Sequence, residues 1–141
     1  MTHSHAGLPR TARLLEPAEF ARVYDLRQSA ADGSLVLYAA PNRLEAGEVR
    51  LGLSVSRRIG GAVVRNAWKR RLREAFRTLR SALPPGNDFV IVVRGGPPPF
   101  GAAAMRATAA AIARLAGRVV ARKGYAAVRP DPQAPRPKRR R

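Results

Sequence analysis

The chain has 141 residues, and its 27 lysines and arginines outnumber its nine acidic residues, which gives a formal net charge of +18. This length favours one compact domain. The absence of cysteine excludes a disulfide framework and a thiolate metal site, and it favours a reducing, cytoplasmic compartment. The apolar runs are far shorter than the roughly 18 residues that a membrane-spanning helix needs, and we expect no membrane contact and no secretory signal.

Both ends of the chain differ from its middle. Residues 1–9 lack hydrophobic periodicity, and we expect them to be mobile. Residues 10–124 have the periodic patterns of a folded domain. Residues 125–141 include four prolines and six basic residues, which is the composition of a disordered basic tail. Most of the positive charge lies outside this tail, so the domain itself is expected to meet an anionic partner.

The first predicted element is a helix over roughly residues 17–28. Pro17 suits the first turn of this helix, because a missing N–H costs nothing there. Phe20, Val23 and Tyr24 recur at helical spacing and define its apolar face.

Two strands are predicted next. Residues 35–39 follow a glycine and are suited to a strand. Residues 49–56 are the clearest strand of the chain, because large apolar residues alternate with small or polar ones. The apolar face of that strand comprises Val49, Leu51, Leu53 and Val55, and the other face comprises Arg50, Gly52, Ser54 and Ser56.

A long helix is predicted over about residues 63–82, with an apolar stripe that includes Trp68, Leu72 and Phe76. Residues 89–93 are continuously apolar, as expected of a strand that is covered on both faces. A final helix follows the proline-rich segment. The sequence therefore predicts an α+β fold, a single small α/β sandwich with the order α-β-β-α-β-α and room for one further short strand.

The long helix also carries a strongly positive face. Residues 57–80 contain nine basic residues and one acid, Glu74. A solvated face usually mixes both signs, whereas Lys69, Arg73 and Arg77 are like-charged neighbours at spacings that destabilise a helix. A bound polyanion would relieve this repulsion. The polar residues that fall within an arc of about 100° on this helix are Asn66, Lys69, Arg70, Arg73, Arg77 and Arg80.

Folded RNA is a better candidate for that polyanion than DNA. Only Asn66 on this face could read a base edge, and strands flank the helix on both sides. A sheet-and-helix domain that grips phosphates suits recognition of RNA by shape.

The aromatic residues allow two interpretations. Phe20 and Tyr24 share a helix face and Tyr38 lies in the middle of a strand, so all three could be core residues. They could instead form a platform on which unpaired bases stack. The small polar face of the strand at residues 49–56 would leave room for a groove there, which Arg50 and Arg94 could line.

The sequence offers no catalytic group and no metal site. The nine acids are scattered, which argues against a metal-dependent nuclease. The only histidines, His3 and His5, lie in the N-terminal segment, where no general base is expected.

One long motif resembles the bacterial ribonuclease P protein component. The motif begins with Leu51-Gly52-Leu53-Ser54-Val55-Ser56-Arg57-Arg58-Ile59-Gly60 and continues with Ala62-Val63-Val64-Arg65-Asn66, Lys69-Arg70, Arg73-Glu74 and Phe76-Arg77. The similarity extends from about Leu8 through Lys123 and includes Arg13-Leu14 and Asp88-Phe89-Val90-Ile91.

The resemblance implies a left-handed βαβ crossover, which departs from the usual handedness. It implies a monomeric, cytoplasmic protein that pairs with a catalytic RNA and helps it remove the 5′ leader from precursor tRNA. The ribonucleoprotein is an endoribonuclease whose RNA performs the hydrolysis, with Mg²⁺ held mainly by that RNA. This explains why the chain has no catalytic residues of its own.

The resemblance also assigns residues to two surfaces, to which the charge pattern adds Arg77 and Arg94. The surface for the catalytic RNA comprises Arg65, Asn66, Lys69, Arg70, Arg73 and Arg77, and the cleft for the leader comprises Phe20, Tyr24, Tyr38, Arg57, Arg58 and Arg94.

The chain departs from the family pattern at several positions. Ala67 and Gly95 stand where a basic residue is common, and Tyr24 replaces a frequent phenylalanine. Two other functions remain open: a structural RNA-binding protein such as a ribosomal protein, and a free-standing nuclease.

Overall fold

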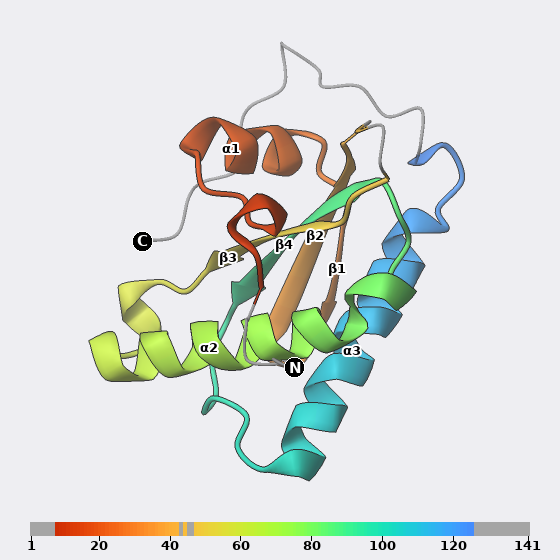
Figure 1. The fold of residues 1–141 in the computed structure, drawn as a ribbon. Helices are drawn as coiled ribbons and strands as arrows, with labels where there is room; N and C mark the ends of the chain where they lie inside the picture. The colour runs from red at the N-terminus through yellow and green to blue at the C-terminus, as the bar shows by residue number, and fades with distance from the viewer. Residues whose placement is uncertain (1–7, 43, 45–46, 126–141) are drawn as a thin grey trace.

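The computed structural model describes residues 8–42, 44 and 47–125. Four strands form one mixed sheet in the order β1-β2-β4-β3, with α1 on one face and α2 and α3 on the other (Figure 1). The strands are β1 (Ser29–Asp32), β2 (Leu35–Pro41), β3 (Arg50–Ser54) and β4 (Asn87–Val93), and the helices are α1 (Pro17–Asp25), α2 (Ala62–Leu79) and α3 (Ala102–Val120).

The predicted α+β class and the order of the elements are confirmed. The further short strand is β1, which pairs antiparallel with β2 from Ser29↔Tyr38 to Asp32↔Leu35. Helix α1 ends three residues earlier than expected, because Arg27 adopts a positive φ of 56° that no α-helix accommodates. The chain then turns directly into β1.

Strand β4 is the centre of the sheet. It pairs antiparallel with β2, where Leu37 lies opposite Ile91, and parallel with β3, where Leu53 lies opposite Ile91. All residues of β4 are buried, as its continuous apolar run predicts. Helix α2 connects the parallel neighbours β3 and β4, so these three elements form the βαβ unit of the fold.

Two hydrophobic clusters lie on opposite faces of the sheet because side chains alternate along each strand. The larger cluster lies between the sheet and helices α2 and α3, and it includes the stripe predicted for α2. The smaller cluster lies beneath α1 and includes Val23, Leu26, Val90 and Val92, with Phe20, Tyr24, Val36 and Tyr38 packed against it.

The two ends of the domain extend beyond the predicted boundaries. Leu8 is only 2% exposed, and its carbonyl oxygen accepts two hydrogen bonds from the Arg13 guanidinium, at 3.0 and 2.7 Å. Tyr125 is buried and donates a hydrogen bond of 2.8 Å to Asn87 Oδ1, and burial raises the pKa of this phenol. Both residues therefore belong to the folded domain, because each fills the edge of a hydrophobic core. The rest of the predicted N-terminal segment and tail, apart from Pro9, lies outside the described residues.

Within the described ranges, no helix is long and apolar enough to cross a membrane.

Candidate nucleic-acid interface

Helix α2 presents the predicted positive face to solvent. We call Arg65, Asn66, Lys69, Arg70, Arg73 and Arg77 the basic ridge, and each of them is exposed or half-buried. Among the described residues, only Arg77 of this ridge forms an ion pair, with Glu74 at 2.6 Å. The Arg65 guanidinium donates to the Gly60 carbonyl oxygen at 3.1 Å, which orients it without neutralising it. Most of the ridge therefore keeps its positive charge available for a polyanion.

A hollow of about 350 Å³ lies between the basic ridge and the N-terminal segment. The Arg13 side chain reaches this hollow from the segment before α1. The backbone of Arg13 pairs with Leu51 of β3 in a single parallel β-bridge. Burial, and secondarily the positive charge of Arg13, lowers the pKa of Arg73. Two cations held this close favour an anion between them. The lining residues are Leu8, Arg13, Asn66, Lys69, Arg70, Arg73 and Glu74.

Arg13 and Leu8 are site residues that the sequence did not predict. Arg13 appeared there only as part of the Arg13-Leu14 pair, and nothing in its neighbourhood along the chain connects it with α2. The connection depends on the bridge to β3 and on the burial of Leu8, which bring this segment against the helix.

The aromatic residues lie on the face of the sheet that α1 covers, opposite α2 and α3. We call Phe20, Tyr24 and Tyr38 the aromatic face. The Tyr24 and Tyr38 rings meet edge to face, with centroids 4.9 Å apart and an interplanar angle of 86°. The Phe20 ring lies directly over Gly52 of β3, where any Cβ atom would approach it to 2.8 Å. The three rings are thus positioned by the sheet.

This arrangement leaves both interpretations of the aromatic residues open. The rings pack on the small hydrophobic cluster, and each is half-buried. Their inner faces therefore stabilise the fold while part of each ring stays in contact with solvent. The sequence predicted that the small polar face of β3 would leave a groove, but at Gly52 this space is filled by the Phe20 ring.

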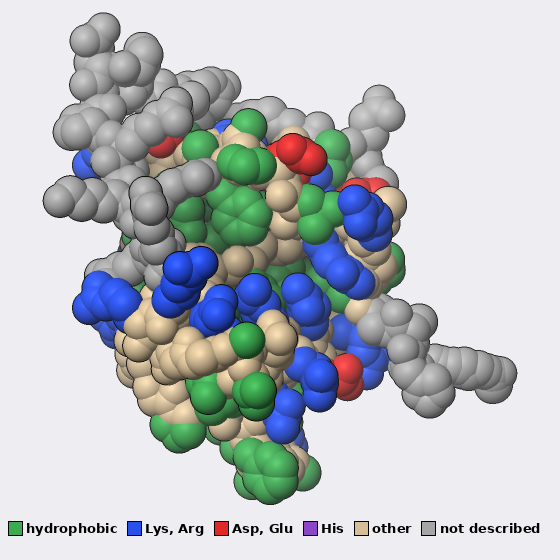
Figure 2. All heavy atoms as spheres, turned by 90° about the vertical axis from the view of Figure 1, so that its left-hand side faces the viewer, with side chains coloured by type: hydrophobic (Ala, Val, Ile, Leu, Met, Phe, Trp, Pro, Cys, Tyr) green, Lys and Arg blue, Asp and Glu red, His purple; other side chains and the backbone are tan. Residues whose placement is uncertain are grey.

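The basic residues predicted for the leader cleft lie at one end of the sheet. Because β3 and β4 are parallel, the segments that follow them emerge at the same edge of the sheet. Arg57 and Arg58 follow β3, and Arg94 follows β4; all three are exposed. The Arg94 guanidinium donates to the Gly33 carbonyl oxygen at 2.8 Å. Figure 2 shows a band of lysine and arginine side chains below a group of hydrophobic ones, with the surface recessed between them.

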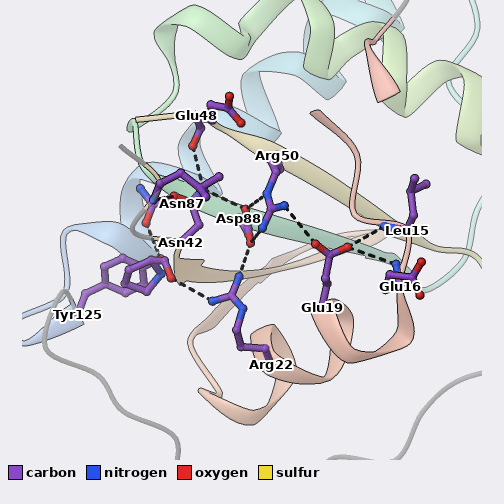
Figure 3. A network of polar contacts seen from close by, with 12 residues as sticks. Leu15, Glu16, Glu19, Arg22, Asn42, Glu48, Arg50, Asn87, Asp88 and Tyr125 are labelled. Atoms are coloured by element: carbon purple, nitrogen blue, oxygen red, sulfur yellow. Dashed lines mark hydrogen bonds and ion pairs between the residues drawn. The ribbon is translucent and has the colours of Figure 1, made fainter. Parts of the chain in front are cut away.

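Arg50 does not line the groove as an available cation, which corrects the sequence-based expectation. Its guanidinium donates to both carboxylate oxygens of Asp88 at 2.8 Å and to Glu19 at 3.1 Å (Figure 3). The hydrogen bond to Asp88 is the main cause that raises the pKa of Arg50. Arg22 forms a second ion pair with Asp88, and Asn42 donates to the same carboxylate at 3.0 Å. This arginine cluster around the buried Asp88 carboxylate is structural.

The comparisons with known proteins agree with the geometry. A protein-family model described as ribonuclease P matches residues 8–120. The chain belongs to the ribonuclease P protein family. It is 37% identical over 124 residues to the ribonuclease P protein component of Roseiflexus castenholzii, which covers 88% of this chain and 98% of that protein. It is 44% identical over 86 residues to the component from Caldanaerobacter subterraneus, covering 61% of this chain and 72% of that one.

A solved structure of a ribonuclease P protein has the same fold. The Staphylococcus aureus RNase P protein matches with a TM-score of 0.56 and 32% sequence identity, covering 77% of this chain and 92% of that chain. The family resemblance stated from the motif is therefore confirmed.

In this ribonuclease P protein, the described residues contain no group of three or more His, Asp or Glu side chains that could hold a metal ion. The most buried carboxylate, Asp88, is occupied by two arginines, and Glu19 accepts from Arg50 and from the backbone N–H groups of Leu15 and Glu16. These donor sets do not fit a site for Mg²⁺, which prefers carboxylate and water oxygens without competing cations.

Proposed function

We propose that this protein is the subunit of ribonuclease P that binds the catalytic RNA along its basic ridge and the 5′ leader of precursor tRNA on its aromatic face. Membership of the family makes the chain a subunit of ribonuclease P, the ribonucleoprotein endonuclease that processes tRNA. The division of labour between the two surfaces is the part that we infer from the geometry.

The observation that carries the proposal is the charge state of α2. Arg65, Lys69, Arg70 and Arg73 have no carboxylate within ion-pair distance among the described residues, although the fold pairs other arginines with acids. Holding like charges together on one helix is unfavourable unless an anion lies against them. An RNA backbone provides phosphates at the required density.

The aromatic face suits a single strand. Exposed parts of the Phe20, Tyr24 and Tyr38 rings can stack on unpaired bases, and Arg57, Arg58 and Arg94 at its edge can contact the phosphates of the same strand. A duplex presents its bases already stacked, so this surface discriminates in favour of an unpaired leader.

The RNA would supply both the hydrolysis and the Mg²⁺ sites, because the carboxylates in the described part of the chain are not grouped in a way that suits this ion. Mg²⁺ held by the RNA would provide an activated water as the nucleophile. The protein side chains bind and orient the two RNA partners. We further propose that one copy of the protein acts in each complex, in the cytoplasm.

The salt dependence of RNA binding tests the basic ridge. If about five phosphates contact the ridge, the slope of log affinity against log salt is expected to be near −3.5, at about −0.7 per contact. Lys69→Ala and Arg70→Ala are each expected to reduce that slope by about 0.7. An affinity that does not change with salt would contradict the proposal.

The leader cleft is tested by comparing two substrates. In the complex reconstituted with the catalytic RNA, Phe20→Ala and Tyr24→Ala are expected to weaken binding of precursor tRNA by about 1–3 kcal/mol per lost stacking contact, and to leave mature tRNA unaffected. Equal losses for both substrates would favour a purely structural RNA-binding protein. Accurate 5′ cleavage by the protein without RNA would instead identify a free-standing nuclease.

A further inference from the structure

Phe100 is the feature that the two proposed surfaces leave unexplained. Its side chain lies in the segment between β4 and α3 and is 82% exposed. Burying this large apolar side chain against a partner would stabilise the complex. The aromatic face lies on the other side of the sheet, so Phe100 cannot belong to it.

The backbone of the segment that carries Phe100 is restricted at several positions. Trp68 Nε1 of α2 donates a hydrogen bond to the Gly96 carbonyl oxygen at 3.2 Å. Gly96 and Gly101 flank three consecutive prolines and have positive φ values of 86° and 84°, which other residues rarely adopt. Prolines restrict the backbone between them. The ring is therefore presented on a preorganised support, which lowers the entropic cost of binding a partner.

A cation of α2 covers part of the ring. The Arg71 guanidinium carbon lies 5.9 Å from the centroid of Phe100, within the range of a cation–π contact. Arg71 shares one side of α2 with Ala67 and Val63, at spacings of four residues. Val63 is 84% exposed. We call Val63, Ala67, Arg71 and Phe100 the flanking strip.

The flanking strip lies beside the basic ridge. Arg70 and Arg71 are consecutive, so their side chains point about 100° apart around the helix axis. An RNA strand whose phosphates contact Arg70 can therefore continue around α2 to reach Phe100. An exposed aromatic ring with an adjacent guanidinium is suited to a base and its phosphate, and the +18 charge of the chain favours an anionic partner.

We propose that the flanking strip binds an unpaired nucleobase of the catalytic RNA, which stacks on Phe100 while Arg71 contacts the neighbouring phosphate. This inference rests on the proposed binding of RNA to the basic ridge and extends that interface to a second side of α2. It adds a contact that depends on an aromatic ring and not on charge alone.

The test uses the full chain and the catalytic RNA, with Phe100→Ala and Phe100→Trp. The alanine variant is expected to bind RNA at least about fivefold more weakly, the effect of losing one stacked base, with an unchanged salt slope because no charge is removed. The tryptophan variant is expected to retain affinity, and its fluorescence is expected to be quenched when RNA binds. Trp68, the only native tryptophan, is buried and provides the background signal.

Leu15→Ala is the matched control, because Leu15 is also an exposed apolar residue but lies beside α1. Its RNA affinity is expected to equal that of the unmodified protein. Thermal unfolding of the Phe100 variants is expected to be unchanged, since the ring is solvent-exposed.

Two results would overturn the inference: an unchanged RNA affinity of Phe100→Ala, or an unchanged emission of Phe100→Trp. If Lys69→Ala and Arg70→Ala still weaken binding in that case, only the flanking strip is refuted. If the ridge variants also bind normally, the proposed function fails as well.

Discussion

Two groups of arginines in this protein have opposite environments. Arg22 and Arg50 surround Asp88, which is fully buried, and their charges are balanced within the chain. The arginines of the basic ridge lie on the surface of α2, where Glu74 is the only acid of the helix and pairs with Arg77. The same residue type is therefore neutralised within the fold in one place and left available for an anionic partner in the other, according to where the carboxylates lie.

The arginine cluster around Asp88 also positions the aromatic face. Arg50 extends from β3 and connects Asp88 of β4 with Glu19 at the start of α1. Glu19 in turn accepts hydrogen bonds from the backbone at the helix N-terminus. Because Phe20 follows Glu19 directly, this chain of contacts places its ring over Gly52.

The largest expected effect on stability concerns the arginines around Asp88. Asp88→Asn removes the counter-charge that Arg22 and Arg50 share and leaves Arg50 with Glu19 alone. We expect a loss of about 3 kcal/mol in the free energy of unfolding. We expect a value at the lower end of the range for a buried ion pair, because the Arg22 side chain is 37% exposed and water partly compensates its charge. Urea unfolding measures the loss.

Asp32→Asn is the control for that variant. Asp32 pairs with Arg114, and both side chains are exposed, at 43% and 51%. We expect a loss below about 1 kcal/mol. Similar losses for the two variants would show that burial does not distinguish these ion pairs.

An intermediate effect is expected at the junction of α1 with the sheet. Gly52→Ala places a Cβ atom 2.8 Å from the Phe20 ring, so the ring must move. We expect a loss of about 1–3 kcal/mol in stability and a weaker preference for precursor over mature tRNA. Gly117→Ala in α3 is the control, because its Cβ atom meets open space, and it is expected to stabilise the protein by up to about 1 kcal/mol. Unaltered substrate preference in Gly52→Ala would argue against a leader site at Phe20.

The smallest expected effect is a change in RNA affinity when the one acid beside the basic ridge is neutralised. Glu74→Gln removes the partner of Arg77 and adds one available cation, so RNA affinity is expected to rise severalfold, with a salt slope steeper by about 0.7. The hydrogen bond from Arg77 lowers the pKa of Glu74. The pair therefore contributes stability above the ordinary pKa of a glutamate, and this contribution is lost as the pH falls through the lowered value.

Urea titrations at pH 3–5 measure this contribution. The unmodified protein is expected to lose it as the pH falls, whereas Glu74→Gln is expected to show no such loss. A weaker affinity of the variant for RNA would mean that Glu74 itself is needed at the interface.

Local patterns in the sequence determined the repeating elements and one of the two surfaces. The alternation over residues 49–56, the continuous apolar run of residues 89–93 and the amphipathic pattern of α2 each follow from the fixed periodicity of a strand or a helix. The basic ridge was predictable for the same reason, because all its residues lie on one helix.

Contacts between distant segments were decided only by the tertiary structure. Arg50 and Asp88 are 38 residues apart, and only the parallel register of β3 and β4 brings them together. Arg13 reaches the hollow beside α2 through a bridge to Leu51, and Leu8 and Tyr125 join the domain because each fills the edge of a core. Periodicity indicates which face of an element is buried, but the partner on that face is selected by how the whole chain packs.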